Sequence, residues 1–256
     1  VDSATLAGLR DCCIDRGLPV SCSSCLSKSE FICDNALGDS TLTAHAYSPM
    51  WCKICGITSV TDGKYAADVG ADAIGLNFYS SSARFVATEN ARSISTAMNE
   101  YAPNCDRIGL FVNHSESEVK SVLKQVPLDI LQFHGAESAE FCESFEMPFI
   151  KVLSVQPGLN FAALEKQYSS AWALLLDTYH PTQAGGTGQI FDWRLWPQDS
   201  HAKLILAGGL TVDNVAHAIQ QTSPFGVDVS GGVEGEVKGE KQQQLVRRFI
   251  KEAKNV

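Results

Sequence analysis

The chain has 256 residues, of which 45% are hydrophobic and 19% are charged, and its formal net charge is -9 at pH 7. This length is typical of a single (β/α)8 domain and allows a large buried core. The negative charge argues against nucleic-acid binding, because no basic field would attract phosphate backbones. No apolar run approaches the roughly 18 residues that span a bilayer, so we expect no membrane anchor.

The beginning of the chain differs in composition and in apolar pattern from the rest. Residues 1–48 contain many Ser, Asp, Gly and Cys residues but no sustained apolar period. They also lack the basic start and the continuous apolar centre of a secretory signal. We expect a poorly ordered, dispensable extension over residues 1–48 and one domain over residues 49–256. The chain begins with Val1 and not with Met, which fits a fragment, a processed product or a doubtful start site.

The cysteines bear on the compartment and on metal binding. There are nine of them, and an odd number without a secretory signal argues against a disulfide framework. We therefore expect a cytoplasmic protein. As a different use of four thiols, Cys22 and Cys25 together with Cys52 and Cys55 resemble a paired Cys-x-x-Cys zinc site. The spacing between the pairs is longer than in a usual zinc ribbon, so we expect no metal.

From residue 50 onward, short apolar runs alternate with amphipathic stretches, as in repeated βα units around a parallel sheet. Ser115 and Glu118 have the spacing of a capping box at the start of one helix. Eight strands indicate a (β/α)8 TIM barrel, whereas a doubly wound open sheet of this size usually has fewer. The expected strands are 51–55, 72–77, 107–112, 129–133, 149–153, 173–177, 203–207 and 226–230, and helices include 115–125, 211–220 and 241–254.

In such a barrel the chemistry lies at the carboxyl ends of the strands. The apolar run Leu174–Leu176 ends in Asp177, and the glycine-rich segment from Gly185 and Gly186 to Gly188 follows. A buried parallel strand of this kind delivers a carboxylate to the barrel mouth. We therefore expect Asp177 to donate a proton beside a loop that closes over a small substrate.

Two glycine pairs predict a phosphate site. Gly208 and Gly209 follow the seventh strand, and Gly231 and Gly232 follow the eighth strand directly after Ser230. Glycines let backbone N–H groups approach an anion, and the loops after these two strands are the usual phosphate cradle of barrels. The competing interpretation is two tight turns without a ligand.

Further polar side chains fall at strand ends or in the loops that follow. Cys55 ends the first strand and is either a general base or an inert buried thiol. Lys53 shares its strand face, and we expect it to contact Asp228 on the neighbouring eighth strand as a structural pair. Arg84 has the chemistry to grip a carboxylate with two hydrogen bonds, or it is a solvated loop cation. His134 either donates a proton, lines the pocket or has a structural role.

The ordered motifs resemble phosphoribosylanthranilate isomerase of tryptophan biosynthesis from about residue 52 to the C-terminus. The resemblance rests on Lys53-Ile-Cys-Gly-Ile-Thr58, Gly70-Ala-Asp-Ala-Ile-Gly-Leu76, Phe78-Tyr79 with Arg84, Gly109-Leu-Phe-Val-Asn113, Leu131-Gln-Phe-His-Gly135, Gly185-Gly-Thr-Gly188 with Phe191-Asp-Trp193, Leu206-Ala-Gly-Gly-Leu210 and Gly226-Val-Asp-Val-Ser-Gly-Gly-Val-Glu234. Single motifs recur in many phosphate-binding barrels, but the ordered set is specific. Departures are few: Gly231 stands where a second serine is frequent, and Gln189 where lysine is common.

The resemblance implies an Amadori rearrangement of N-(5'-phosphoribosyl)anthranilate to 1-(2-carboxyphenylamino)-1-deoxyribulose 5-phosphate. It implies that Asp177 is the general acid that opens the sugar ring and that Cys55 is the general base that removes the C2' proton. Arg84 would bind the anthranilate carboxylate. The implied substrate-binding residues are Arg84, His134, Gly185, Gly186, Gly208, Gly209, Asp228, Ser230 and Gly231.

The same resemblance implies a small phosphorylated substrate, no cofactor and no metal, in a monomer or homodimer. The nearest rival is an aminoaldose isomerase of histidine biosynthesis, but such relatives generally have an aspartate where Cys55 stands. Two hypotheses from different classes of protein stay open: a non-catalytic phosphate-binding barrel, and a redox module that uses the cysteine pairs.

Overall fold

The computed structural model describes residues 50–178 and 192–256. The predicted extension over residues 1–48, with Cys22 and Cys25, lies outside the described residues. So do Gly185 and Gly186, for which the predicted roles stay predictions.

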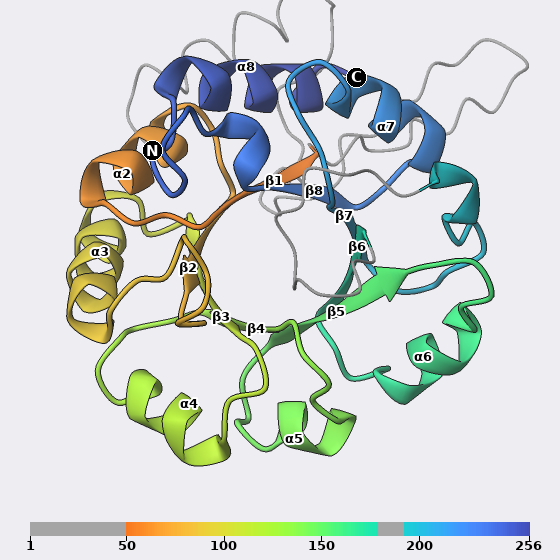
Figure 1. Cartoon of the computed structure of the whole chain (residues 1–256), viewed down its shortest axis with the longest axis horizontal. Coiled ribbons are helices and arrows are strands. Elements are labelled where there is room, and N and C mark those ends of the chain that lie inside the picture. The colour runs from red at the N-terminus through yellow and green to blue at the C-terminus, as the bar shows by residue number, and fades with distance from the viewer. Residues whose placement is uncertain (1–49, 179–191) are drawn as a thin grey trace, which may run out of the picture. The chain divides into compact units, whose positions relative to one another are not determined.

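Eight parallel strands form a closed barrel in which each strand pairs with its neighbours in sequence and β1 pairs with β8 (Figure 1). This confirms the predicted TIM barrel, and every expected strand is present within two residues at either end. The strands are β1 (Trp51–Cys55), β2 (Ala73–Asn77), β3 (Asp106–Phe111), β4 (Ile130–Phe133), β5 (Phe149–Val155), β6 (Ala173–Thr178), β7 (Leu204–Leu206) and β8 (Gly226–Val229).

Helices surround the barrel on its outside (Figure 1). The capping box is confirmed, because the Ser115 hydroxyl accepts from the Glu118 N–H while the Glu118 carboxylate accepts from Ser115. Between β6 and β7, the described residues contain only a short 3-10 helix, η1 (Trp193–Leu195). The others are α2 (Val60–Asp68), α3 (Thr88–Tyr101), α4 (Glu116–Leu123), α5 (Ala139–Glu143), α6 (Phe161–Gln167), α7 (Val215–Thr222), η2 (Gly231–Val233) and α8 (Gln243–Lys254).

The strand period of two separates two cores. Side chains that face the helices form the larger one, and side chains that face inward form the smaller one at the barrel's centre. Each strand therefore brings one inward-facing residue to its carboxyl end. The inner core consists of Ala73, Ile108, Ile130, Ile150, Val152, Ala173, Leu175, Ile205 and Ala207.

One charged pair interrupts this apolar interior. Lys53 on β1 is fully buried, and its Nζ lies 2.9 Å from Oδ1 of Asp228 on β8. The two residues are register partners across the strand pair that closes the barrel. The predicted Lys53–Asp228 contact is therefore confirmed.

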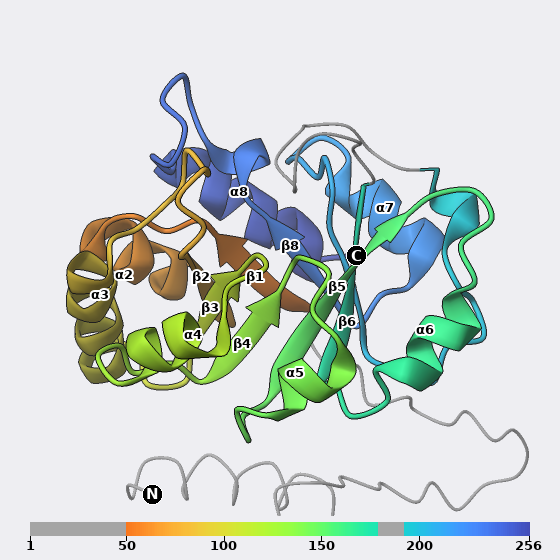
Figure 2. The ribbon, with the colours of Figure 1, turned by 60° about the horizontal axis from the view of Figure 1, so that its bottom comes forward.

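The loops that follow the strands rise at one rim of the barrel, toward which β4 and β5 point in Figure 2. The segments after β2 and after β8 meet there, as an ion pair between Arg84 and Glu234 shows. Among the described residues, no helix is long and apolar enough to cross a membrane.

Candidate active site

Cys55 ends β1 with its thiol inside the barrel mouth and only 6% of the residue exposed. Its register partner on β2 is Gly75, where a Cβ atom would lie 2.8 Å from the thiol sulfur. A side chain there would displace the thiol, so the glycine makes room for it. Burial raises the pKa of Cys55 above its ordinary value, while the nearby charge of Lys53 acts to lower it.

Lys53 stays charged in spite of complete burial. Desolvation alone would lower its pKa, but the carboxylate of Asp228 and the thiol of Cys55 together raise it above the ordinary value. An ammonium group thus lies directly below the candidate base. Its field favours the thiolate form of Cys55, which is the form that accepts a proton.

Asp177 on β6 faces the same cavity from another side of the barrel. Its Oδ1 accepts a hydrogen bond of 2.7 Å from the Thr178 N–H, and its Oδ2 lies 3.4 Å from Nε2 of His134. Gly208 has a φ of +81°, and a Cβ atom there would lie 2.8 Å from the same Asp177 Oδ1. The backbone after β7 thus approaches the carboxylate as closely as only glycine permits.

A buried ion pair fixes the loop that carries His134. Lys151 on β5 donates to Glu137 Oε2 at 3.0 Å and to the Gly135 carbonyl at 2.6 Å. The other carboxylate oxygen of Glu137 accepts from the Asn113 N–H at 2.7 Å. Contacts of Lys151 and Glu137 thereby join β5 to the segments that follow β3 and β4, next to His134 in the chain.

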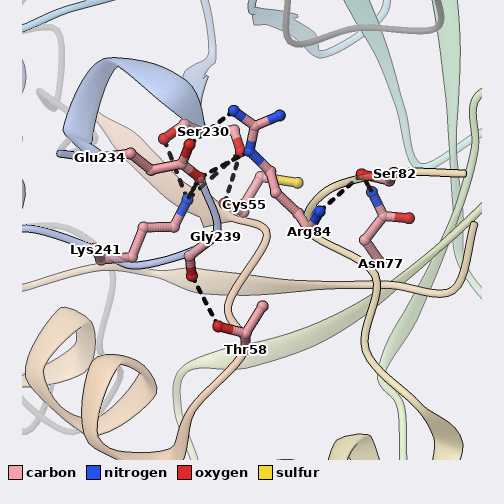
Figure 3. A network of polar contacts seen from close by, with 9 residues as sticks. All are labelled: Cys55, Thr58, Asn77, Ser82, Arg84, Ser230, Glu234, Gly239 and Lys241. Carbon is pink, nitrogen blue, oxygen red and sulfur yellow. Dashed lines mark hydrogen bonds and ion pairs between the residues drawn. The ribbon is translucent and has the colours of Figure 1, made fainter. Parts of the chain in front are cut away.

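Arg84 lies in the loop between β2 and α3, and its side chain is only 11% exposed, so it is not a solvated loop cation. The guanidinium forms a two-pronged ion pair with Glu234 (Figure 3). This contact raises the pKa of Arg84 above its ordinary value, although burial acts against it. The arginine therefore stays charged at the edge of the cavity.

Two adjoining cavities occupy the barrel mouth. One has a volume of about 240 Å³, and both Cys55 and Asp177 line it. The other has about 390 Å³ and lies against the two glycine-rich turns. Of the predicted site residues, Cys55, Arg84, His134, Asp177, Asp228 and Ser230 line the first cavity, and Arg84, Asp177, Gly208, Gly209, Asp228, Ser230 and Gly231 line the second.

The structure adds four polar residues that the sequence reasoning missed. Lys238 lines both cavities, and Glu234 and Lys241 lie beside Arg84. Gln132 lines the first cavity, and its Oε1 has no hydrogen-bond partner among the described residues. Gln132 could have been found, because it stands two residues before His134 on the same strand face. Lys238 lies after β8 in a segment that has no local signal, and Lys241 stands at the start of the expected helix 241–254, two residues before α8 begins.

The zinc hypothesis fails on strand geometry. Cys52 and Cys55 are three residues apart on β1, so they point to opposite faces of the strand. Cys52 packs in the core between barrel and helices, where burial raises its pKa to about 12, whereas Cys55 lines the cavity. One zinc ion cannot bind both thiols. Within residues 50–178 and 192–256, no group of three or more His, Cys, Asp or Glu side chains is placed to hold a metal.

The fold and this site define a (β/α)8-barrel enzyme with a pocket of small-molecule size at the carboxyl ends of its strands. Residues 52–252 match the family model of N-(5'-phosphoribosyl)anthranilate isomerase. The isomerases of that name from Pseudomonas putida and Azotobacter vinelandii are 48% and 49% identical. Each match covers 79% of this chain, with 96% and 97% of those proteins.

Solved structures of the same family are also similar to this chain. The chain is similar to a phosphoribosylanthranilate isomerase in complex with reduced 1-(o-carboxyphenylamino)-1-deoxyribulose 5-phosphate, with a TM-score of 0.68 and 36% identity over 81% of this chain and 100% of that one. The Thermus thermophilus enzyme gives 0.70 and 31% over 79% of this chain and 98% of that one. The chain therefore belongs to the N-(5'-phosphoribosyl)anthranilate isomerase family and is an intramolecular isomerase, which confirms the resemblance drawn from its motifs.

Proposed function

We propose that this chain converts N-(5'-phosphoribosyl)anthranilate to 1-(2-carboxyphenylamino)-1-deoxyribulose 5-phosphate in tryptophan biosynthesis, with Asp177 as general acid and Cys55 as general base. The observation that carries the proposal is the single cavity that both side chains line from β1 and β6. The solved relative in complex with the reduced deoxyribulose 5-phosphate compound supports the substrate class.

The two residues supply the two proton transfers that the rearrangement needs. Asp177 gives its proton to the furanose ring oxygen while the C1'–O bond breaks, and the nitrogen lone pair forms the C=N bond of a Schiff base. Cys55 as thiolate then removes the C2' proton, and the electrons of that C–H bond shift to form an enolamine. Tautomerisation of the enolamine gives the ketone product. Each such acid–base group typically contributes about 10²–10⁴-fold in rate.

The remaining predicted residues suit the two anionic ends of this substrate. The backbone of Gly208 and Gly209, with that of Ser230 and Gly231, lines the larger cavity and offers N–H groups to the phosphate. Arg84 lies at the border of both cavities and would bind the anthranilate carboxylate. Lys238 lines both cavities as well and adds positive charge at the mouth.

The test is the loss of anthranilate-derivative fluorescence with purified protein and N-(5'-phosphoribosyl)anthranilate. We expect turnover by the wild type and a fall of about 10²–10⁴-fold in kcat for both Cys55→Ala and Asp177→Asn. Cys105→Ala is the matched control, since this buried thiol lies before β3, away from the cavities. Full activity of both site variants would refute the mechanism, and an inactive wild type would refute the function.

We also propose the cytoplasm as the location, because a reducing compartment preserves the free thiol that serves as base. The extension over residues 1–48 stays a prediction, and deletion of it with retained folding and activity would support its being dispensable. A monomer or homodimer also stays a prediction. A relative from Thermotoga maritima is described as dimeric, so light scattering of this chain in solution is the direct measurement.

A further inference from the structure

Arg84 is held in place along its whole length. Its backbone N–H donates to the Ser82 hydroxyl at 3.1 Å, and that hydroxyl also accepts from the Asn77 amide at 3.0 Å. A Cβ atom on Gly56 would lie 2.7 Å from the Arg84 Cδ, and one on Gly231 would lie 3.1 Å from its Nη2. The side chain thus runs between the end of β1 and the predicted phosphate loop after β8, with room made by a glycine on each side.

Glu234 fixes the far end of this arginine (Figure 3). Its two carboxylate oxygens accept from Nε and Nη2 of Arg84, each at 2.7 Å, and only 4% of its side chain is exposed. Paired parallel hydrogen bonds of this kind set the orientation of the guanidinium plane as well as its position. Desolvation acts to raise the pKa of Glu234, but Arg84 and Lys241 lower it further, so the carboxylate is ionised.

Lys241 supports Glu234 from behind. An isolated antiparallel bridge pairs the two residues, which brings the Lys241 Nζ to 2.8 Å from Glu234 Oε1. The same ammonium donates to the Ser230 carbonyl at 3.1 Å, and the Ser230 hydroxyl donates to the Cys55 carbonyl at 3.0 Å. One chain of contacts therefore joins Arg84 to the predicted phosphate loop and to the strand end that carries the base.

The contact with Glu234 uses only one edge of the guanidinium. A guanidinium presents a side-on edge, Nε with one terminal nitrogen, and an end-on edge formed by both terminal nitrogens. Glu234 occupies the side-on edge, whereas Nη1 has no hydrogen-bond partner among the described residues. Since Nη2 carries two hydrogens, the end-on edge can still bind a second carboxylate with two hydrogen bonds.

We propose that Glu234, backed by Lys241, is a positioning residue that holds Arg84 so that its end-on edge receives the substrate's carboxylate. The inference rests on the proposed function, because it assigns that carboxylate to Arg84. It adds that Glu234 does not compete for the arginine but orients it. It also adds that the carboxylate site and the predicted phosphate loop form one connected unit through Lys241 and Ser230.

A purely structural pair would have a different signature. If Glu234 only stabilised the segment after β8, its loss would affect every ligand equally. If it acts through Arg84, its loss affects only ligands that carry the carboxylate. The decisive measurement is therefore calorimetric binding of two ligands: the reduced product analogue 1-(o-carboxyphenylamino)-1-deoxyribulose 5-phosphate, and its counterpart with an unsubstituted phenyl ring.

The variant is Glu234→Gln, which keeps the size of the side chain but removes its charge. We expect the Kd for the carboxylated ligand to rise about 10- to 100-fold, as for a lost charged hydrogen-bond pair. The Kd for the phenyl ligand should change less than about threefold. Arg84→Met should raise the Kd for the carboxylated ligand at least as much. Adding Glu234→Gln to Arg84→Met should not raise this Kd further, because the two residues act as a unit.

Glu165→Gln is the matched control. Glu165 on α6 also accepts several hydrogen bonds, from Ser200, His201 and Ala202, but at the loop that leads into the opposite end of β7. It should leave both affinities unchanged. If thermal melting shows that Glu234→Gln does not fold, Glu234→Asp, which keeps the charge but withdraws it from the arginine, takes its place in both titrations.

Equal losses for both ligands, or no loss for either, would overturn the positioning role. Additive losses in the double variant would do the same. These outcomes differ from a failure of the proposed function, in which the wild-type protein would not turn over N-(5'-phosphoribosyl)anthranilate. Binding of the two stable ligands is measured without turnover, so it tests the arrangement of Glu234 and Arg84 in either case.

Discussion

Cys55 on β1 and Asp177 on β6 line the same cavity, yet their surroundings differ. The thiol lies among charges, with Lys53 and Asp228 below it and Lys241 near the end of its strand. The carboxylate has a backbone N–H, the ring of His134 and the glycine turn after β7 around it. The first set of neighbours is ionic and buried, and the second is made mostly of uncharged groups.

The difference corresponds to the two tasks that we propose. A base must lose its proton before it acts, and a buried thiol does so only where a cation offsets the cost of burying its charge. An acid must hold a proton until the sugar ring opens, and a cation next to it would work against that. A barrel can meet both needs because its strands carry the two side chains to separate sides of one mouth.

The largest expected effect comes from changing the base itself. Cys55→Ser retains the shape of the side chain, but a serine hydroxyl does not ionise near neutral pH, so kcat should fall by about 10²–10⁴-fold. Cys55→Asp supplies a carboxylate that is ionised next to Lys53, and it should recover at least about tenfold of that loss. Steady-state fluorescence assays check both. Serine as active as cysteine would show that this side of the cavity needs no ionisable group.

On the acid side, the largest expected effect apart from that of changing Asp177 itself comes from Gly208→Ala. The new Cβ would lie 2.8 Å from Asp177 Oδ1 and would collide with Thr178 Oγ1, at a φ of +81°. The carboxylate must move, so we expect kcat to fall about 100-fold or more, since misplacement of about 1 Å has such effects.

Gly158→Ala is the control that separates the effect of the Cβ contact with Asp177 from the effect of a side chain at positive φ. Gly158 has a similar φ of +84°, but its Cβ would meet nothing within 4 Å. The control should cost about 1–2 kcal/mol of stability for the left-handed conformation and leave kcat unchanged. Chemical denaturation and kcat together test this. Equal kcat losses in the two variants would mean that Gly208 serves only the turn.

The barrel and the strand-borne part of its site were predictable because both follow from local patterns. A mainly apolar run of five residues predicted the bounds of β1 correctly. The ends of the apolar runs placed Cys55 and Asp177 near the carboxyl ends of their strands. Even the Lys53–Asp228 contact could be expected, because closure of the barrel makes β1 and β8 neighbours.

The parts that escaped prediction depend on how loops fold back in space. Glu234 belongs to one of the family motifs, but nothing local indicates that it turns toward Arg84, which is 150 residues away. Lys241 meets Glu234 only because the segment after η2 doubles back into an antiparallel bridge. Similarly, α7 begins at Val215, four residues after the predicted start, since Thr211 and Asn214 form a turn of their own.

A smaller effect should follow from removal of the ion pair below the base. Lys53→Met alone would leave Asp228 buried without its counter-ion, so the informative variant is Lys53→Met with Asp228→Asn. Lys53 lowers the pKa of Cys55 more than Asp228 raises it, so removal of both raises that pKa. The rise of kcat/KM with pH, which reports the thiolate, should therefore move to higher pH, with activity near neutrality reduced on the order of tenfold.

The pH profile also distinguishes this electrostatic role from a structural one. If Lys53 and Asp228 only fill the barrel, the double variant should have a lower Tm but an unchanged pH dependence. A shift of the profile to lower pH would contradict the role that we assign to Lys53. Lys151, another buried lysine, faces Glu137 and not the thiol, so its removal should leave the pH at which kcat/KM rises unchanged.

The smallest effect that we expect concerns His134, the polar neighbour of the acid. Its Nε2 lies 3.4 Å from Asp177 Oδ2, a long contact that can orient the carboxyl group but adds little binding energy. His134→Asn should therefore lower kcat by no more than about tenfold and change KM little. His217→Asn is the control, because that ring contacts Trp193 away from both cavities. A loss as large as that of Asp177→Asn would mean that the proton passes through the imidazole. Asp177 would then act together with a charged neighbour, as Cys55 does with Lys53, and the contrast between the surroundings of the two residues would disappear.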